Sequence, residues 1–456
     1  MKLVSTKIKF LYGLGFSAKG IKDGLFQLFV FFYFSQVLGL DAALAGTATV
    51  IALLFDAVSD PIVGLISDKW KSDKWGRRHP FMFASAIPLG LFTWLLFLPP
   101  TGLSQTGLFL WLTTFAILLR FALTLFLVPS MSLGAELSSN YEERTSIMSF
   151  RIMFGALIAP LVIIFGLLTF FVPKPGMENG LFNVEAYPKF AFLCAILMIL
   201  SIFISAWGTR EVIPNLPKTS DQQSKRSIFG LLSDFKLALS LSSYRTMLGF
   251  IIVVYVAMGI GIAFTPYFTT YYFGLSEKEL AALPISSALA GLIALVATPW
   301  LGKKLDKKNG ALVSTILFAF FFSLPFNLRL LGLFPANGAP ALLLSYVVYL
   351  LFAYIFVWIA LGLANSMMAD IVDEYELKTG QRQEGLFFST ISFAYKCSSG
   401  LGYFFAGLML NWIAFPKQAK SSDVPAETMQ DLGVIGGPVL MFIYLASIVF
   451  IVFYPI

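Results

Sequence analysis

Apolar segments of membrane-spanning length recur along the whole chain. A helix needs about 20 residues to cross the hydrocarbon core of a bilayer. Hydrophobic residues make up 58% of the sequence and charged residues 12%, whereas soluble domains contain roughly 45–50% and 25%. We therefore expect an all-α polytopic membrane protein embedded in a lipid bilayer. The twelve predicted transmembrane helices are 21–40, 44–66, 80–99, 107–134, 149–172, 187–207, 244–272, 282–301, 311–333, 340–368, 385–413 and 434–454.

The basic residues are distributed unevenly between the two sides of the predicted spans. Most of the 32 Lys and Arg residues fall on the side that holds both termini. Cytoplasmic loops carry an excess of basic residues, so both termini are expected to be cytoplasmic. The formal net charge of +7 therefore reflects topology, and no nucleic-acid partner is expected. The expected location is the inner (plasma) membrane of a bacterium.

The longest polar interruption divides the predicted spans into two sets of six. A short motif recurs after the second span of each set, as Gly64 with Asp68-Lys69 and as Gly302 with Asp306-Lys307. Parallel repeats of this kind are typical of major facilitator transporters, whose substrate site lies near the midplane between the halves. The predicted domains are an N-terminal six-helix bundle, a central cytoplasmic linker and a C-terminal six-helix bundle, over 1–207, 208–243 and 244–456.

Two carboxylates lie inside the second predicted span. Asp56 and Asp60 are four residues apart, so both project from one face of a helix. An aspartate at the centre of a spanning helix costs about 2.5–3.5 kcal/mol on insertion scales, and such residues mark ion or substrate pathways. The repeat alignment places Ala294 and Thr298 at the corresponding positions. The carboxylates thus belong to one half, which favours a functional role over an architectural one.

This aspartate pair has two interpretations. It either compensates the embedded cations Arg151 and Lys396 and locks the bundle, or it binds a cation. Hard ions such as sodium prefer several oxygen ligands at one point, and the hydroxyls of Ser59 and Thr124 could supply more of them. Two nearby carboxylates also repel each other, so one of them readily holds a proton when no metal is present. Sodium held by the two aspartates and a proton therefore both stay open as the coupling ion.

The first predicted span places polar residues on one face near its start. Lys19, Asp23 and Gln27 follow one another at intervals of four. A carboxylate acceptor and an amide would suit a hydroxyl-rich ligand. The structural alternative is an ion pair of Asp23 with Lys19 or Lys22 at the membrane interface.

Charged residues at the cytoplasmic ends of the spans form a candidate gate. Arg77 and Arg78 are expected to hydrogen-bond helix ends or Asp68 and so hold one conformation. Acidic residues after the tenth predicted span could contact the basic loops of the other half. The candidate gate residues are Asp68, Arg77, Arg78, Asp306, Asp370 and Asp373.

The chain lacks the sequence motifs that identify common enzyme classes. No Walker loop, HExxH, GxSxG or cluster of Cys and His residues occurs in it. The single histidine, His79, falls in a predicted cytoplasmic loop. We therefore expect no catalytic residues, no enzymatic activity, and no cofactor besides a coupling ion.

Several linked stretches are similar to one transporter family. They are 55–64, 74–81, 134–138, 141–145, 150–151, 368–374, 383–388 and 395–396, with the central motifs FDAVSDPIVG and KWGRRHPF. These stretches run through both halves and resemble the glycoside–pentoside–hexuronide:cation symporters. The resemblance implies a major facilitator fold and cation-coupled sugar transport.

The resemblance also assigns roles to individual positions. Asp56 and Asp60 match the cation-binding aspartates of the family, and Thr124 matches a threonine hydroxyl of the same site. Ser59 stands where a family member has an asparagine. Arg151 and Lys396 match charged residues near the sugar and cation sites.

Two positions depart from the family pattern. The sugar-binding aspartates of the first and fourth helices align with Gly20 and Leu127. Galactoside recognition is therefore doubtful, and Asp23, about one turn beyond Gly20, is the candidate replacement.

The expected function is symport of a sugar or glycoside coupled to sodium or protons, by alternating access of a monomer. One alternative keeps the fold but transports a lysophospholipid or another amphiphile. A polytopic membrane enzyme would need an embedded histidine or a catalytic carboxylate at the membrane face. The single histidine in a predicted loop and the two-half repeat argue against such an enzyme. A receptor or sensor would need a sizeable soluble domain, and the sequence shows none.

Overall fold

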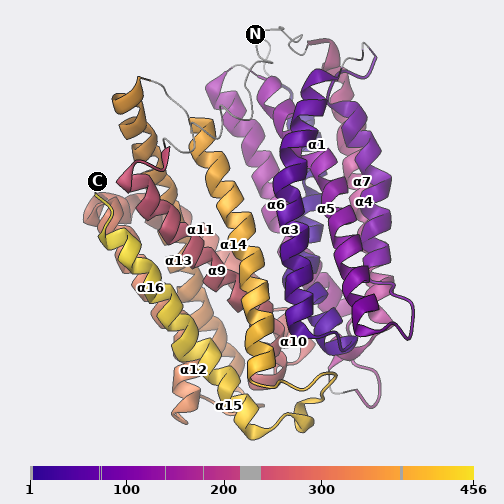
Figure 1. The fold of residues 1–456 in the computed structure, drawn as a ribbon, viewed down its shortest axis with the longest axis vertical. Coiled ribbons are helices and arrows are strands. Elements are labelled where there is room, and N and C mark those ends of the chain that lie inside the picture. The colour runs from indigo at the N-terminus through magenta and orange to yellow at the C-terminus, as the bar shows by residue number, and fades with distance from the viewer. Residues whose placement is uncertain are drawn as a thin grey trace. The chain divides into compact units, whose positions relative to one another are not determined.

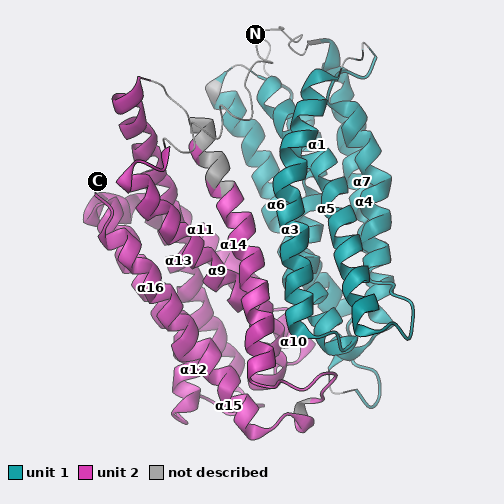
Figure 2. Ribbon diagram, viewed as in Figure 1, with its two compact units in different colours: residues 1–219 teal, residues 220–456 magenta. Residues whose placement is uncertain are grey.

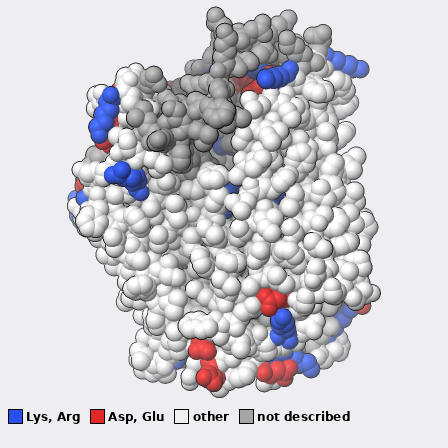
Figure 3. Space-filling model, viewed as in Figure 1, with Lys and Arg blue, Asp and Glu red and all other residues white. Residues whose placement is uncertain are grey.

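The computed structural model describes residues 4–70, 72, 74–138, 140–177, 179–215, 238–380 and 384–455. Within these ranges every regular element is helical (Figure 1). Ten of the described helices are long and apolar enough to cross a membrane. On the face drawn in Figure 3, most charged side chains lie toward the ends of the helices. The expectation of an all-α polytopic membrane protein is confirmed.

The chain divides into two compact units, Met1–Thr219 and Ser220–Ile456 (Figure 2). The predicted linker 208–243 falls mostly on residues 216–237, which lie outside the described ranges. Its described N-terminal part continues α7 and then forms the short helix η4. The predicted domain boundaries therefore stay a prediction.

Unit 1 consists of helices that follow one another along the chain with short connections. The long helices α3 and α5 pack against each other, and α4 packs against both α5 and α7. Its elements are α1 (Thr6–Gly15), α2 (Ser17–Gly24), η1 (Leu25–Val30), η2 (Tyr33–Val37), α3 (Ala42–Lys69), α4 (His79–Leu96), α5 (Gln105–Glu136), α6 (Tyr141–Thr169), η3 (Gly180–Phe182), α7 (Ala186–Thr209) and η4 (Arg210–Asn215).

Unit 2 repeats several of these pairings. Helix α11 packs against α13, as α3 packs against α5 in unit 1. Its elements are α9 (Ser242–Tyr267), η6 (Phe268–Tyr272), α10 (Glu277–Leu280), α11 (Leu283–Leu305), α12 (Lys307–Leu330), α13 (Ala341–Thr379), α14 (Glu384–Trp412), η7 (Ser421–Asp423), α15 (Ala426–Val434), η8 (Ile435–Val439) and α16 (Leu440–Val452).

The first helical segment begins earlier than predicted. It starts at Thr6 rather than at 21, with the Ser5 side chain accepting a hydrogen bond from the Ile8 amide. Lysines in this stretch lower its hydropathy, whereas its glycines allow close packing. A Cβ atom at Gly20 would lie 2.9 Å from the Gly155 carbonyl oxygen on α6. The hydropathy of the sequence therefore did not predict the first part of this helical segment, which packs closely against the backbone of α6.

The repeated motif ends differently in the two units. In unit 1, Gly64 to Lys69 form the last turns of α3 rather than a loop. In unit 2, α11 ends at Leu305, and Asp306 adopts a φ of 67° and caps α12. The motif, predicted to follow the second span of each set, is therefore mostly helical in both units, with Gly64 to Lys69 inside α3 and Gly302 to Leu305 inside α11.

Candidate functional site

The polar side chains of α3 and α5 meet in two adjacent pairs. Arg120 Nη1 donates a hydrogen bond to Asp56 Oδ2 over 2.8 Å. One helical turn further on, Thr124 Oγ1 donates to Asp60 Oδ1 over 2.7 Å. Each helix contributes residues spaced i, i+4, which place two side chains on one face about a turn apart. The α3–α5 pairing therefore brings three of the predicted site residues together with one that was not predicted.

The first of these pairs is buried within unit 1. Asp56 and Arg120 keep only 5% and 8% of their surface exposed. Asp56 Oδ1 and Arg120 Nε are both buried with no hydrogen-bond partner among the described residues. Buried polar atoms are nearly always paired, so an unmatched acceptor and donor in one ion pair need an explanation.

Arg120 is the residue that sequence reasoning missed. Arg151 and Lys396 were the predicted partners of the aspartates. In unit 1 the cation paired with Asp56 is Arg120, and the Arg151 guanidinium lies over the Phe16 ring at 5.6 Å. The signal was present, because Arg120 precedes Thr124 by four residues, as Asp56 precedes Asp60. Lys396 lies on α14 in unit 2.

Ser59 lies beside the Asp56–Arg120 pair, but its hydroxyl hydrogen-bonds the backbone of its own helix. It is buried, with 4% of its surface exposed. Its hydroxyl donates to the Asp56 carbonyl oxygen over 3.5 Å. The hydroxyl oxygen of Ser59 is thus held near the aspartates by the backbone of α3.

The predicted polar face of the first helix contains a triad of charges. Asp23 forms ion pairs with Lys19 and Lys22, each at 2.5 Å. The structural alternative stated for Asp23 is therefore present. Gln27, four residues further on, is exposed on unit 1.

An aromatic ring connects this triad to the α3–α5 pairs. The Phe26 ring lies 5.6 Å from Lys22 Nζ and 5.3 Å from the Arg120 guanidinium carbon. Cations within about 6 Å of a ring centroid are attracted by the ring quadrupole. The charged residues of α2 and α5 therefore belong to one polar cluster within unit 1.

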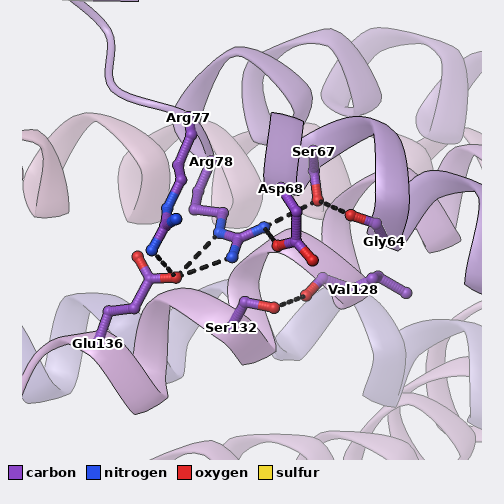
Figure 4. A network of polar contacts seen from close by, with 8 residues as sticks. All are labelled: Gly64, Ser67, Asp68, Arg77, Arg78, Val128, Ser132 and Glu136. Carbon is purple, nitrogen blue, oxygen red and sulfur yellow. Dashed lines mark hydrogen bonds and ion pairs between the residues drawn. The ribbon is translucent and has the colours of Figure 1, made fainter. Parts of the chain in front are cut away.

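The candidate gate of unit 1 is a network centred on Arg78 (Figure 4). The Arg78 guanidinium contacts Asp68 at 2.6 Å, Glu136 at 2.8 Å and the Ser67 hydroxyl at 2.9 Å. Arg77 contacts Glu136 at 2.9 Å. The predicted contact between Arg78 and Asp68 is present, and Glu136, at the end of α5, joins both arginines. The network ties the cytoplasmic ends predicted for α3 and α5 to the start of α4.

Two of the three candidate gate residues of unit 2, Asp306 and Asp370, both contact Lys307. Lys307 Nζ contacts both carboxylate oxygens of Asp370 at 2.7 Å. The Asp306 carboxylate accepts a hydrogen bond from the Lys307 amide over 2.7 Å. Asp373 is exposed on α13.

Comparison with known proteins identifies the family. A family model described as MFS/sugar transport protein matches residues 11–456, so the chain belongs to this family of transporters. The predicted membership among the glycoside–pentoside–hexuronide:cation symporters is confirmed, and the protein is a multi-pass membrane transporter rather than an enzyme.

Relatives of the chain include transporters of several bacteria. The isoprimeverose transporter of Lactiplantibacillus pentosus is 27% identical, over 88% of this chain and 79% of its own. The uncharacterized symporter YjmB of Bacillus subtilis is 29% identical, over 92% of this chain and 86% of its own. A glucuronide carrier protein homolog of Escherichia coli is 24% identical, over 86% and 80%.

Solved structures share the fold at low sequence identity. The nucleoside transporter NupG superposes with a TM-score of 0.62 at 14% identity, over 98% of this chain and 99% of that one. A bacterial homolog of the lysosomal transporter Spinster gives a TM-score of 0.63 at 17% identity, over 98% and 93%. The likeness supports a major facilitator fold.

Proposed function

We propose that this protein is a secondary active transporter that couples the entry of sodium or protons to the uptake of a sugar or glycoside in a bacterial inner membrane. The single observation that carries the coupling is the α3–α5 cluster, in which two carboxylates lie inside a membrane-spanning helix. Embedded carboxylates are costly and mark ion pathways. Sugar as the cargo is supported by family membership and by the isoprimeverose transporter among the relatives.

The proposed topology has twelve spans with both termini in the cytoplasm. Ten are the helices long and apolar enough to cross a membrane. The two others are the segment formed by α1, α2, η1 and η2, and helix α14. The distribution of basic residues supports the orientation.

The proposed cation site comprises Asp56, Asp60, Thr124 and Ser59. Asp60 is half-buried and receives a hydrogen bond from a neutral hydroxyl. A cation bound here would favour substrate binding by a coupling free energy, and the substrate would favour the cation by the same amount.

The proposed substrate site draws on charged and amide side chains. The candidates are Lys19, Asp23, Gln27, Arg151 and Lys396. Asp23 is the proposed replacement for the family carboxylate at position 20. A side chain at Gly20 would not fit, because its Cβ would lie 2.8 Å from the Ile158 Cβ. The close packing of α2 against α6 therefore requires a glycine at position 20, where the family has an aspartate.

A second candidate function, transport of an amphiphile, has one supporting observation. Unit 2 has an open groove of about 570 Å³ lined by Leu292, Ile293, Val296, Ala297 and Trp300. Its mainly apolar lining would suit an acyl chain. A lipid of the surrounding bilayer would fill it equally well, so sugar transport stays the principal proposal.

Uptake into vesicles containing the purified protein tests the principal proposal. A panel of pentosides, hexosides, hexuronides and a lysophospholipid would be assayed under imposed sodium or proton gradients. We expect at least one sugar or glycoside to accumulate with one of the gradients. Uptake that ignores both gradients, and is unchanged by Asp56→Asn and Asp60→Asn, would contradict the proposal. Accumulation of the lysophospholipid alone would favour the second candidate.

A further inference from the structure

We propose that Arg120 is a built-in counter-cation that takes the place of a bound metal ion at Asp56. Asp56 and Asp60 would then not hold sodium between them in this protein. The inference rests on the proposed cation-coupled function. It specifies that the proposed cation site does not bind sodium. It makes Arg120 a residue that determines ion specificity.

The geometry of the α3–α5 pairs does not fit a sodium ion at both aspartates. Sodium needs several oxygen ligands converging on one point. One oxygen of Asp56 already accepts the Arg120 Nη1 donor at 2.8 Å. A guanidinium has donors and no acceptor atoms, so it can replace a cation but cannot coordinate one. Its positive charge also opposes a second cation beside Asp56.

Arg120 is held in this place by its surroundings within unit 1. Its residue surface is 8% exposed, and the Phe26 ring lies 5.3 Å from its guanidinium carbon. An arginine stays protonated in proteins, whereas a lysine can lose its charge when buried. The positive charge at Asp56 is therefore permanent as long as the side chain stays in this position.

The formal charges of the Asp56–Arg120 pair already balance without a metal. Arg120 places one positive charge 2.8 Å from the single carboxylate of Asp56. Burying a net charge inside a membrane protein is costly, and embedded charges pair with one another. Adding a sodium ion would leave the pair with an excess positive charge, whereas removing Arg120 would leave the Asp56 carboxylate without a cation.

Sodium binding to the purified full-length protein tests this inference without any substrate. The assays are equilibrium binding of radioactive sodium and thermal unfolding in sodium chloride against choline chloride at equal ionic strength. Wild type is expected to show no saturable sodium binding and no difference between the salts. Arg120→Ala is expected to gain saturable sodium binding and to unfold at a higher temperature in sodium chloride than in choline chloride.

Two further variants test whether the charge of Arg120, rather than the shape of its side chain, excludes sodium. Arg120→Lys, as long as the lysine is protonated, keeps a cation and should stay indifferent to sodium. Arg120→Gln keeps a donor to Asp56 without the charge and should gain a sodium response even if Arg120→Ala does not fold. Adding Asp56→Asn to either responsive variant should abolish the gain.

Two outcomes would overturn the inference. One is saturable sodium binding by wild type that is lost in Asp56→Asn. The other is the absence of a sodium response in a folded Arg120→Gln variant. Neither outcome depends on uptake, so a failure of this inference is distinguishable from a failure of cation-coupled sugar transport.

Discussion

The helix pair α3–α5 of unit 1 and the helix pair α11–α13 of unit 2 occupy corresponding places in the repeat but differ in chemistry. The alignment that pairs Pro61 with Pro299 also pairs Asp60 with Thr298, and Thr124 with Gly362. In unit 1, Thr124 donates a hydrogen bond to Asp60. In unit 2, a Cβ atom at Gly362 would lie 3.0 Å from the Thr298 Cγ2. In the α3–α5 pair, two polar side chains therefore face each other. In the α11–α13 pair, the backbone of α13 lies close to a methyl group of α11.

A second difference concerns Asp56 and its counterpart Ala294. Both positions are buried, with 5% and 4% of their surface exposed. Asp56 requires Arg120 as a partner, whereas the methyl group of Ala294 requires none. The embedded ion chemistry described here therefore lies in unit 1, and the corresponding positions of unit 2 support packing. Duplicated bundles can diverge in this way without changing the helix pairing.

The cytoplasmic networks of the two units differ in burial. The Arg78 side chain is 5% exposed and contacts two carboxylates. The Lys307 side chain is 39% exposed, and that of its partner Asp370 is 35% exposed. An exposed ion pair contributes little to stability, because water screens both charges. The unit 1 network should therefore hold its helices more firmly than the unit 2 pair.

The largest expected effect comes from removing the carboxylate of Asp56. Asp56→Ala would leave the Arg120 charge buried without its partner, which costs about 3–5 kcal/mol. Chemical or thermal unfolding in detergent would measure the loss. Thr298→Ala on α11 is the matched control and should cost about 1 kcal/mol or less, because the Thr298 hydroxyl bonds the Ala294 carbonyl of its own helix. Equal losses for the two variants would contradict the contrast between the units.

The next effect concerns the cytoplasmic networks. Arg78→Ala removes the contacts to Asp68 and Glu136 and should lower the stability of the protein by about 3 kcal/mol. Lys307→Ala breaks an exposed pair and should cost about 1 kcal/mol or less. The same unfolding assay compares them. A larger loss for Lys307→Ala would reverse the order assigned to the two networks.

A smaller effect is expected at the Thr124 hydroxyl. Thr124→Val removes the donor to Asp60 while keeping the shape, and a hydrogen bond to a charged group is worth about 1.5–3 kcal/mol. Thr124→Ser keeps the hydroxyl and should retain most of the stability. Unfolding of both variants, measured together, tests the assignment. A loss in Thr124→Ser as large as that in Thr124→Val would assign the effect to the methyl group instead.

The smallest effect is expected at Lys19. Its ion pair with Asp23 is partly exposed, with side-chain exposures of 46% and 31%. Lys19→Ala should change stability by about 0.5 kcal/mol or less, since Asp23 keeps its second partner, Lys22. A substrate role would appear instead as a rise in the KM for uptake. Unchanged uptake together with unchanged stability would remove Lys19 from the proposed substrate site.

The sequence predicted the class of fold and most of the polar site. Hydropathy and length give membrane-spanning helices directly, because a bilayer requires long apolar stretches. The spacing of Asp56 and Asp60, and the match at Thr124, identified three residues that the α3–α5 pairing brings together. The repeated Gly-x-x-x-Asp-Lys motif indicated the relation between the units.

Other features could not be read from the sequence for physical reasons. A spanning helix is apolar on every side, so hydropathy does not show which face of α5 meets α3, and Arg120 was not matched with Asp56. The start of the first helix was placed too late, because Lys7, Lys9 and Lys19 lower the hydropathy of the stretch that precedes position 21. Glu136 contacts both Arg77 and Arg78 because α5 ends beside them, and the sequence does not show where the end of α5 lies in space.

Uphill accumulation by an Asp60→Asn variant tests the central claim most directly. With a transported sugar found in the panel, wild type, Asp60→Asn and the unit 2 control Thr298→Ala would be compared in vesicles under an imposed cation gradient. Exchange of labelled for unlabelled sugar without a gradient would verify that each variant still binds and translocates. The proposed function predicts that Asp60→Asn loses accumulation but keeps exchange, while Thr298→Ala keeps both. Accumulation by Asp60→Asn at the wild-type level would contradict the assignment of cation coupling to the α3–α5 cluster.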